Sequence, residues 1–171
     1  HQFWPGPLTI ILPKKDSVPF EVTGGMNSVA IRSPNHPVTL KLISELGTPL
    51  AAPSANRFGK ISPTSSSHII DDYNGTVPVL EGGTCSIGVE STIIDMTKDI
   101  GAIRRFGSVL EEDLEAIIGT LGQSDIKTSG THKAHYAPST SLLLSDDIEK
   151  DKTELKAKGL TVATLDINDP S

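Results

Sequence analysis

The chain has 171 residues and a formal net charge of −6, with 15 Lys and Arg against 21 Asp and Glu. This length suffices for one domain with a buried core and some additional chain. The acidic balance argues against binding of nucleic acid through overall charge, although it leaves a local basic patch open. The single cysteine, Cys85, excludes a disulfide or a cysteine-based metal site within the chain.

The sequence shows no targeting or membrane-spanning segment. No apolar run approaches the roughly 20 residues of a membrane span. The opening stretch HQFWPGPLTIIL has neither the basic start nor the cleavage pattern of a secretory signal peptide. We therefore expect a cytoplasmic protein without membrane contacts. Because the sequence starts without Met in an aromatic-rich stretch and stops after a predicted strand, we expect a piece of a longer chain.

The first half of the chain alternates strand and helix patterns. Strands are predicted where β-branched residues alternate or cluster beside turn residues. A helix is predicted between Pro37, which suits a first helical position, and Gly47, which suits a helix end. The predicted elements are strands over 8–12 and 28–33, a helix over 37–46, a short buried strand over 49–52 and a helix from 62 to about 71.

The second half continues this alternation up to residue 120. Pro78 confines the segment 77–80 to the edge of a sheet, because proline cannot donate to a strand ladder. Two further strands are predicted over 89–97 and 102–106. Ser108 and Glu111 form the pattern of a capping box for a helix that ends at Gly119.

The chain then divides into a linker and a second α/β segment. Residues 121–140 are rich in Gly, Ser, Thr, His and Pro, which predicts a linker. A strand over 141–145, a charged helix over 146–159 and a strand over 160–165 follow, a β-α-β arrangement. The alternation over the whole chain predicts an α/β fold, with a twisted, mixed sheet and helices packed on it.

Polar groups gather where the predicted strands end. Arg32 ends one strand, and the stretch APSANRFGKISPT supplies small hydroxyl residues after another. Ser62 stands at a predicted helix start, where free backbone N–H groups favour an anion. Together with Arg105, these groups suit an anionic substrate such as a nucleotide. Each of them also has an ordinary structural interpretation, as a helix cap, a turn or a solvated charge.

Several common catalytic motifs are absent. The Gly59-Lys60 pair lacks the upstream glycine of a Walker-type phosphate loop, and there is no Gly-x-Gly-x-x-Gly. Ser54 lacks the flanking glycines of a hydrolase nucleophile. His132 and His135 are three residues apart, but they lie in the predicted linker without a nearby carboxylate, so we expect no zinc site and no other metal site built from the protein.

Six ordered blocks resemble the YrdC/Sua5 family: FWPGPLTIIL, SVAIRSPNHP, APSANRFGKISPT, GVESTIIDMT, IRRFGSV and AHYAP. The resemblance covers roughly residues 1–138. It implies that residues 1–120 are the C-terminal portion of a YrdC-like catalytic domain, that 121–140 are the linker of the longer Sua5 type, and that 141–171 begin a truncated, Rossmann-like C-terminal domain. Family members make threonylcarbamoyl-AMP from threonine, bicarbonate and ATP, and the threonylcarbamoyl group is later transferred to adenosine 37 of ANN-decoding tRNAs.

The resemblance also implies the roles of individual residues. It implies no covalent catalytic residue, and Mg²⁺ is expected with ATP. Phe106 replaces the family's proline after Arg105, so the turn there is expected to differ. The implied ATP-binding residues are Ser28, Ser54, Asn56, Ser62, Arg105 and Tyr136, and the implied threonine-binding residues are Arg32, Ala52 and Ser91.

Three other interpretations remain open at this point, and the simplest is that this truncated piece is an inactive scaffold even if the parent protein is an enzyme. A YrdC-like module could bind double-stranded RNA or tRNA without catalysis, and such binding would depend steeply on salt. A related carbamoyl-adenylating domain occurs in hydrogenase-maturation proteins and uses carbamoyl phosphate. The HYAP block and the α/β segment after it favour the Sua5 type over that alternative.

Overall fold

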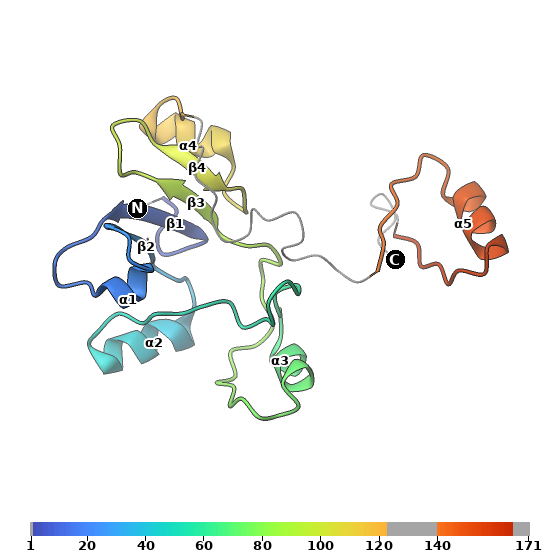
Figure 1. Ribbon diagram of the computed structural model, residues 1–171, viewed down its shortest axis with the longest axis horizontal. Coiled ribbons are helices and arrows are strands. Elements are labelled where there is room, and N and C mark those ends of the chain that lie inside the picture. Colours follow the sequence, from blue (N-terminus) through green and yellow to red (C-terminus); the bar gives the residue numbers. More distant parts are fainter. Residues whose placement is uncertain (1, 123–139, 166–171) are drawn as a thin grey trace. The chain divides into compact units, whose positions relative to one another are not determined.

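The computed structural model describes residues 2–122 and 140–165 (Figure 1). The chain forms two compact units, His1–Ala137 and Pro138–Ser171. In the described part of the first unit, four strands form one sheet and four helices accompany it. No helix within the described ranges is long and apolar enough to cross a membrane.

The sheet has the strand order β2–β1–β3–β4. The two central strands, β1 and β3, run parallel, and each outer strand runs antiparallel to its neighbour. This mixed sheet with its helices confirms the predicted fold class (Figure 1). The strands are β1 at Leu8–Pro13, β2 at Ser28–Arg32, β3 at Thr92–Asp95 and β4 at Ala102–Arg105.

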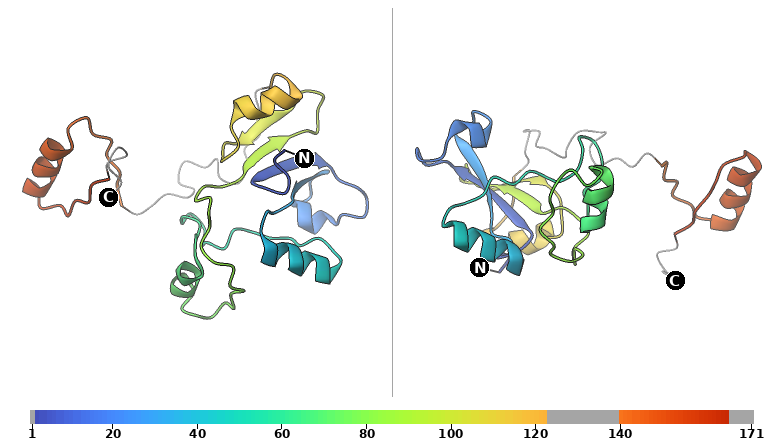
Figure 2. Two further views of the ribbon diagram at one scale, coloured as in Figure 1. Left: turned by 180° about the vertical axis from the view of Figure 1, so that it is seen from behind. Right: turned by 90° about the horizontal axis from the view of Figure 1, so that it is seen from below.

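The hydrophobic core lies on one face of the sheet, under α4 (Glu111–Ile118). Leu8 and Ile94 from the central strands pack with Val109 and with Leu114 of α4. Thr92 is fully buried among them, and its Oγ1 donates to the carbonyl oxygen of Val109 at 2.7 Å and accepts from its N–H at 3.0 Å. Figure 2 shows α4 beside β3 and β4 from two further directions.

The start of α4 differs from the predicted capping box. Leu110 is the N-cap residue and makes no side-chain cap. The hydroxyl of Ser108 is buried and, among the described residues, has no hydrogen-bond partner. Three acidic residues in the first turn, Glu111, Glu112 and Asp113, instead place negative charge at the positive end of the helix.

The helix predicted from Pro37 is confirmed. The helix α2 spans Pro37–Leu46, with proline in its first turn. Gly47 ends it in the left-handed conformation, with φ of 64°, and its N–H donates to the carbonyl oxygen of Ile43. The short helix α1 (Phe20–Thr23), between β1 and β2, was not predicted from the sequence.

Two of the predicted strands of the first unit are wrong, and two further elements have different bounds. The segments 49–52 and 77–80 do not pair with the sheet, and 49–52 is exposed rather than buried. The helix α3 begins at Ser66 and ends at Asp72, so it does not start at Ser62. The strand predicted over 89–97 is also shorter, because pairing with β1 begins where Thr92 meets Leu8.

The described part of the second unit contains only the helix α5 (Ile148–Ala157). Asp147 caps it by accepting from the backbone N–H of Lys150 at 3.1 Å. The strands predicted over 141–145 and 160–165 do not form. An extended segment needs a paired neighbour and a covered face to become a stable strand. This segment has no covered face, since Leu142 and Leu144 are largely exposed. Most of the predicted linker, 123–139, lies outside the described residues.

Candidate functional site

One row of paired residues crosses all four strands of the sheet. Thr9 of β1 pairs with Arg32 of β2 on one side and with Ile93 of β3 on the other. Ile93 in turn pairs with Arg105 of β4. Directly paired residues project to the same face of a sheet. The row therefore places two arginines on one face, about 14 Å apart across three strand spacings.

This row lies on the face opposite the core. Leu8 and Ile94 project into the core, and neighbouring residues along a strand alternate between faces. Thr9 and Ile93 are half-buried, and Arg32 is exposed. Polar side chains can therefore meet a ligand on this face while α4 covers the other.

A bulge selects Arg105 for this row. Ile94 pairs with Ile103, yet the preceding residue, Ile93, pairs with Arg105 instead of Arg104. One extra residue on β4 accounts for the shift, as in a β-bulge. Arg104 turns to Asp95, and its Nε donates to Asp95 Oδ2 at 3.0 Å. The bulge therefore gives two successive arginines different partners.

Asp95 is buried and ionised beside Arg104. Desolvation raises the pKa of its carboxyl, but the Thr97 hydroxyl at 2.6 Å, the Arg104 guanidinium and the Thr97 backbone N–H outweigh it, so the pKa is lowered overall. A buried carboxylate needs such partners to remain charged. The pair fixes the strand that carries Arg105.

Arg105 is held against Ser91. Its Nε and Nη2 both donate to the Ser91 carbonyl oxygen, at 3.0 and 2.9 Å, and Nη2 also donates to Ser91 Oγ at 3.0 Å. Ser91 is 5% exposed, and its Oγ lies 2.9 Å from Thr9 Oγ1. The predicted residues Arg105 and Ser91 are therefore brought together, and Thr9 joins them.

Arg32 lies at the other end of the row. Its Nε donates to the carbonyl oxygen of Gly6 at 3.0 Å, and the Gly6 N–H donates to the carbonyl oxygen of Ser33 at 2.8 Å. A Cβ on residue 6 would lie 2.5 Å from the Phe3 carbonyl oxygen, so glycine is required there. The turn before β1 thereby anchors the exposed guanidinium.

Ser62 reaches the site through Glu90. Its Oγ donates to Glu90 Oε1 at 2.5 Å, and Glu90 Oε2 lies 3.6 Å from Arg105 Nη2. The predicted helix N-terminus at Ser62 is wrong, because Ser65 is the N-cap residue of α3. The hydroxyl is bonded to a distant carboxylate instead of capping a helix.

The loop after residue 51 closes on itself. Asn56 Nδ2 donates to the carbonyl oxygens of Arg57 and Lys60, at 3.0 and 2.9 Å. Its Oδ1 is buried and has no partner among the described residues. Ala52 and Ser54 are exposed on this loop. The structure thus shows an ordered turn at the predicted position.

Ser28 is not brought to the row of arginines. It begins β2 and pairs with Pro13, whereas Arg32 ends the same strand. Four residues of strand separate the two by about 13 Å. Tyr136, the remaining predicted residue, lies outside the described residues.

Two contributors to the site were not identified from the sequence. Thr9 is embedded in an otherwise apolar strand, and its place beside Arg32 follows from register alone. Glu90 stands in the block GVESTIIDMT without an assigned role, although it contacts both Ser62 and Arg105. A threonine in a strand and a glutamate beside one are common in any domain. Only the fold shows that these two residues lie at the site.

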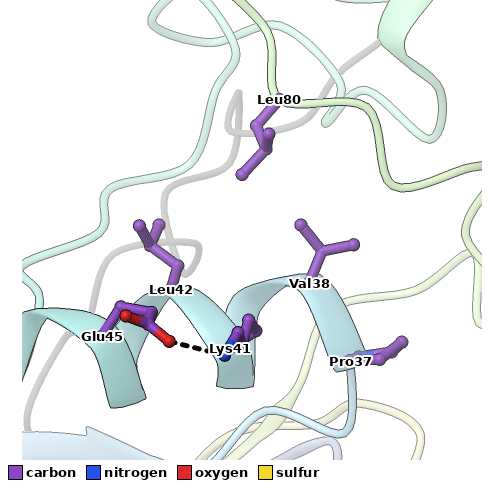
Figure 3. A pocket seen from close by; sticks show the side chains of 6 residues that line it. All are labelled: Pro37, Val38, Lys41, Leu42, Glu45 and Leu80. Atoms are coloured by element: carbon purple, nitrogen blue, oxygen red, sulfur yellow. Dashed lines mark hydrogen bonds and ion pairs between the residues drawn. The ribbon is translucent and has the colours of Figure 1, made fainter.

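A separate open depression lies over α2 (Figure 3). Val38 and Leu42 face Leu80 across it, and Lys41 pairs with Glu45 at its rim at 2.5 Å. None of the predicted site residues lines this depression. Within the described ranges, no group of three or more His, Cys, Asp or Glu side chains could hold a metal ion.

Comparisons with known proteins identify relatives of this chain. It is 41% identical over 169 residues to a threonylcarbamoyl-AMP synthase of Pyrococcus abyssi. The alignment covers 93% of this chain and 49% of that protein. It is 43% identical over 155 residues to a protein of the same name from Bacillus subtilis, covering 85% of this chain and 45% of that protein. The chain thus spans about half the length of the curated relatives it matches.

Solved structures and a family model agree with these relatives. The crystal structure of P. abyssi Sua5 complexed with L-threonine matches with a TM-score of 0.78 at 41% identity, over 92% of this chain and 51% of that one. Residues 1–107 match the Sua5–YciO–YrdC family model, described as telomere recombination. The chain therefore belongs to the Sua5–YciO–YrdC family.

Proposed function

We propose that this chain contributes to an L-threonylcarbamoyladenylate synthase, a nucleotidyltransferase that forms threonylcarbamoyl-AMP and pyrophosphate from L-threonine, bicarbonate and ATP. The observation that carries the proposal is the pair of arginines, Arg32 and Arg105, on one face of the sheet. The relatives' names and the threonine complex of P. abyssi Sua5 support the synthase, whereas they give no support to an RNA-binding module or a hydrogenase-maturation domain.

The two arginines divide the proposed substrates between them. Arg32 is exposed at its end of the row and would bind the carboxylate of threonine. Arg105 is held on Ser91 and would bind phosphate oxygens of ATP. Guanidinium groups bind both kinds of anion through charge-assisted hydrogen bonds. Of the other residues, Ala52 and Ser91 are proposed on the threonine side, and Ser28, Ser54, Asn56, Ser62 and Tyr136 on the ATP side.

The proposed reaction needs alignment more than a protein nucleophile. The threonine amine and bicarbonate would give N-carboxy-threonine with loss of water. One oxygen of its carboxylate would form a bond to the α-phosphorus of ATP as the bond to pyrophosphate breaks. Cationic forks and N–H donors would hold the two anions in line and stabilise charge on the phosphate. We therefore propose no covalent intermediate on the protein.

Mg²⁺ is proposed to arrive with ATP. Mg²⁺ is commonly held by substrate phosphates, waters and one or two carboxylates rather than by an all-protein cage. The carboxylates of the described residues do not gather into such a cage. When bound, the ion would neutralise phosphate charge, while the arginines and hydroxyls of this chain orient the substrates.

The remaining roles extend from the same proposal. The threonylcarbamoyl group would pass to adenosine 37 of ANN-decoding tRNAs through downstream transfer enzymes, so tRNA would be an indirect partner. We propose that the protein acts in the cytoplasm. Residues 141–171 would begin the C-terminal α/β domain of the Sua5 type, after a linker over 121–140.

Thermal unfolding with ligands tests the proposal. A ligand that binds the folded chain raises its Tm. We expect L-threonine and ATP each to raise the Tm of the 171-residue chain, and L-valine, which has the same shape without the hydroxyl, to raise it less. An unchanged Tm with both ATP and threonine at high concentration would contradict the proposal. Equal shifts with threonine and valine would contradict its substrate assignment.

A further inference from the structure

Glu90 connects two residues that lie far apart in the sequence. Its carboxylate accepts a hydrogen bond from Ser62 Oγ at 2.5 Å through Oε1. Its other oxygen, Oε2, lies 3.6 Å from Nη2 of Arg105. One side chain thus joins the end of the loop before α3 to the last residue of β4.

The backbone of Glu90 is fixed by the turn that follows β4. The N–H of Ser108 donates to the Glu90 carbonyl oxygen at 3.3 Å. A Cβ on Gly107 would collide with this same oxygen and with the N–H of Thr92, so only glycine fits there. The turn packs directly on the residues around Glu90. This packing fixes the backbone position from which the Glu90 side chain extends.

The contacts of Arg105 give its guanidinium one orientation. Its hydrogen bonds to Ser91 use Nε and Nη2, and the ion pair with Glu90 also uses Nη2. These contacts occupy one edge of the planar group, so the Nη1 side points away from them. The side chains of Arg105 and Glu90 are 15% and 32% exposed, so the pair lies at the surface of the site rather than in the core.

We propose that Glu90 is a positioning residue for the nucleotide: its carboxylate, held by the hydroxyl of Ser62, orients the guanidinium of Arg105 to receive phosphate oxygens. This inference rests on the proposed function. A carboxylate beside a phosphate site also repels the phosphate. The sign of the effect on ATP affinity therefore separates positioning, which predicts weaker binding without Glu90, from simple repulsion, which predicts tighter binding.

The test compares Glu90→Ala and Glu90→Gln in the 171-residue chain. Isothermal titration would measure the affinities for ATP and for L-threonine. We expect Glu90→Ala to weaken ATP binding several-fold and to leave threonine binding nearly unchanged. Glu90→Gln retains an acceptor for Ser62, so it should recover part of the loss. Glu112→Gln is the matched control, because it removes the charge of an exposed glutamate on α4, the helix that covers the opposite face of the sheet.

Three results would overturn the proposal. The first is ATP binding by Glu90→Ala that is as tight as, or tighter than, that of the parent chain. The second is an equal loss of ATP and threonine affinity together with a lower Tm, which would show a purely structural role. The third is full additivity of Glu90→Ala and Ser62→Ala in the affinity for ATP, because residues that act through one another are not additive.

A measurement without nucleotide separates this inference from the proposed function. The Tm shifts of Glu90→Ala, Ser62→Ala and the double variant report the contact itself. We expect the Tm of the double variant to fall by less than the sum of the decreases in the two single variants. If the parent chain binds no ATP, the proposed function fails, and additive Tm shifts would then overturn the positioning role of Glu90 as well.

Discussion

Arg105 donates two hydrogen bonds from Nε and Nη2 to the carbonyl oxygen of Ser91, the residue just before the neighbouring strand. A guanidinium fork held in this way is pre-organised, because its side chain has already lost most of its freedom before a ligand arrives. The orientation of Arg105 is therefore a property of the sheet and its bulge, and the phosphate contact proposed for it depends on that orientation.

Replacing Arg105 by lysine should weaken ATP binding. Lysine retains the charge but cannot make the planar set of bonds to Ser91. Loss of a charge-assisted hydrogen bond costs about 1.5–3 kcal/mol, or roughly tenfold or more in affinity. Calorimetry with ATP would measure this loss, with Lys15→Ala as a control at an exposed cation. Equal affinity in the parent and in Arg105→Lys would remove Arg105 from the phosphate site.

Arg32→Ala should weaken threonine binding several-fold or more, because the proposed partner of the threonine carboxylate is lost. The structural cost should be small, since Arg32 is exposed and the substitution removes the hydrogen bond from its Nε to the Gly6 carbonyl oxygen. Loss of that bond costs about 1 kcal/mol. Titration with L-threonine measures the affinity and thermal unfolding measures the stability. Unchanged threonine affinity would contradict the assignment of Arg32.

Thr92→Val should destabilise the chain although it preserves the shape of the side chain. The substitution leaves the buried N–H and carbonyl of Val109 without the Thr92 hydroxyl. An unsatisfied buried group costs about 1–3 kcal/mol in the free energy of unfolding. Denaturant unfolding measures the change, and Thr92→Ser, which keeps the hydroxyl, is the matched control. A valine variant more stable than the serine variant would contradict the role of this hydroxyl.

The Asp95–Arg104 pair should make stability depend on pH at the acidic end. The folded state lowers the pKa of Asp95 below its ordinary value of 3.8. The contribution of the Asp95 carboxylate to the free energy of unfolding is therefore complete above about pH 4–5, and it is lost as the pH falls through the folded-state pKa. Asp95→Asn should be less stable at neutral pH and should lose less stability on acidification. Denaturant unfolding between pH 7 and pH 3 measures both, and parallel pH profiles would contradict this account.

The sequence allowed prediction of elements whose bounds depend on local residues. Pro37 and Gly47 bracket α2 because their effects on backbone conformation act within one or two residues. Residues 141–145 and 160–165 have strand-like patterns, yet they form no strand, because pairing depends on partners elsewhere in the chain. The mixed sheet was predicted, but its register could not be read from local patterns.

The candidate site shows the same division. Arg32 and Arg105 could be placed at strand ends from the sequence, and Ser91 matches a family motif, whereas their contacts with substrates stay predictions. Ser62 was predicted as a helix start, since Ser-Pro-Thr is a common beginning of a helix. Its actual partner, Glu90, lies 28 residues away. Thr9 meets Ser91 across 82 residues, so only the fold could place it in the site.

Titration of ATP into the 171-residue chain, with and without saturating L-threonine, tests the central claim most directly. The arginines Arg32 and Arg105 lie in one row, so a bound threonine and a bound nucleotide should be neighbours. We predict that ATP binds and that threonine alters its affinity, with a reciprocal effect of ATP on threonine. A folded chain, verified by circular dichroism, that binds neither ligand would contradict the claim that this face of the sheet is a substrate site.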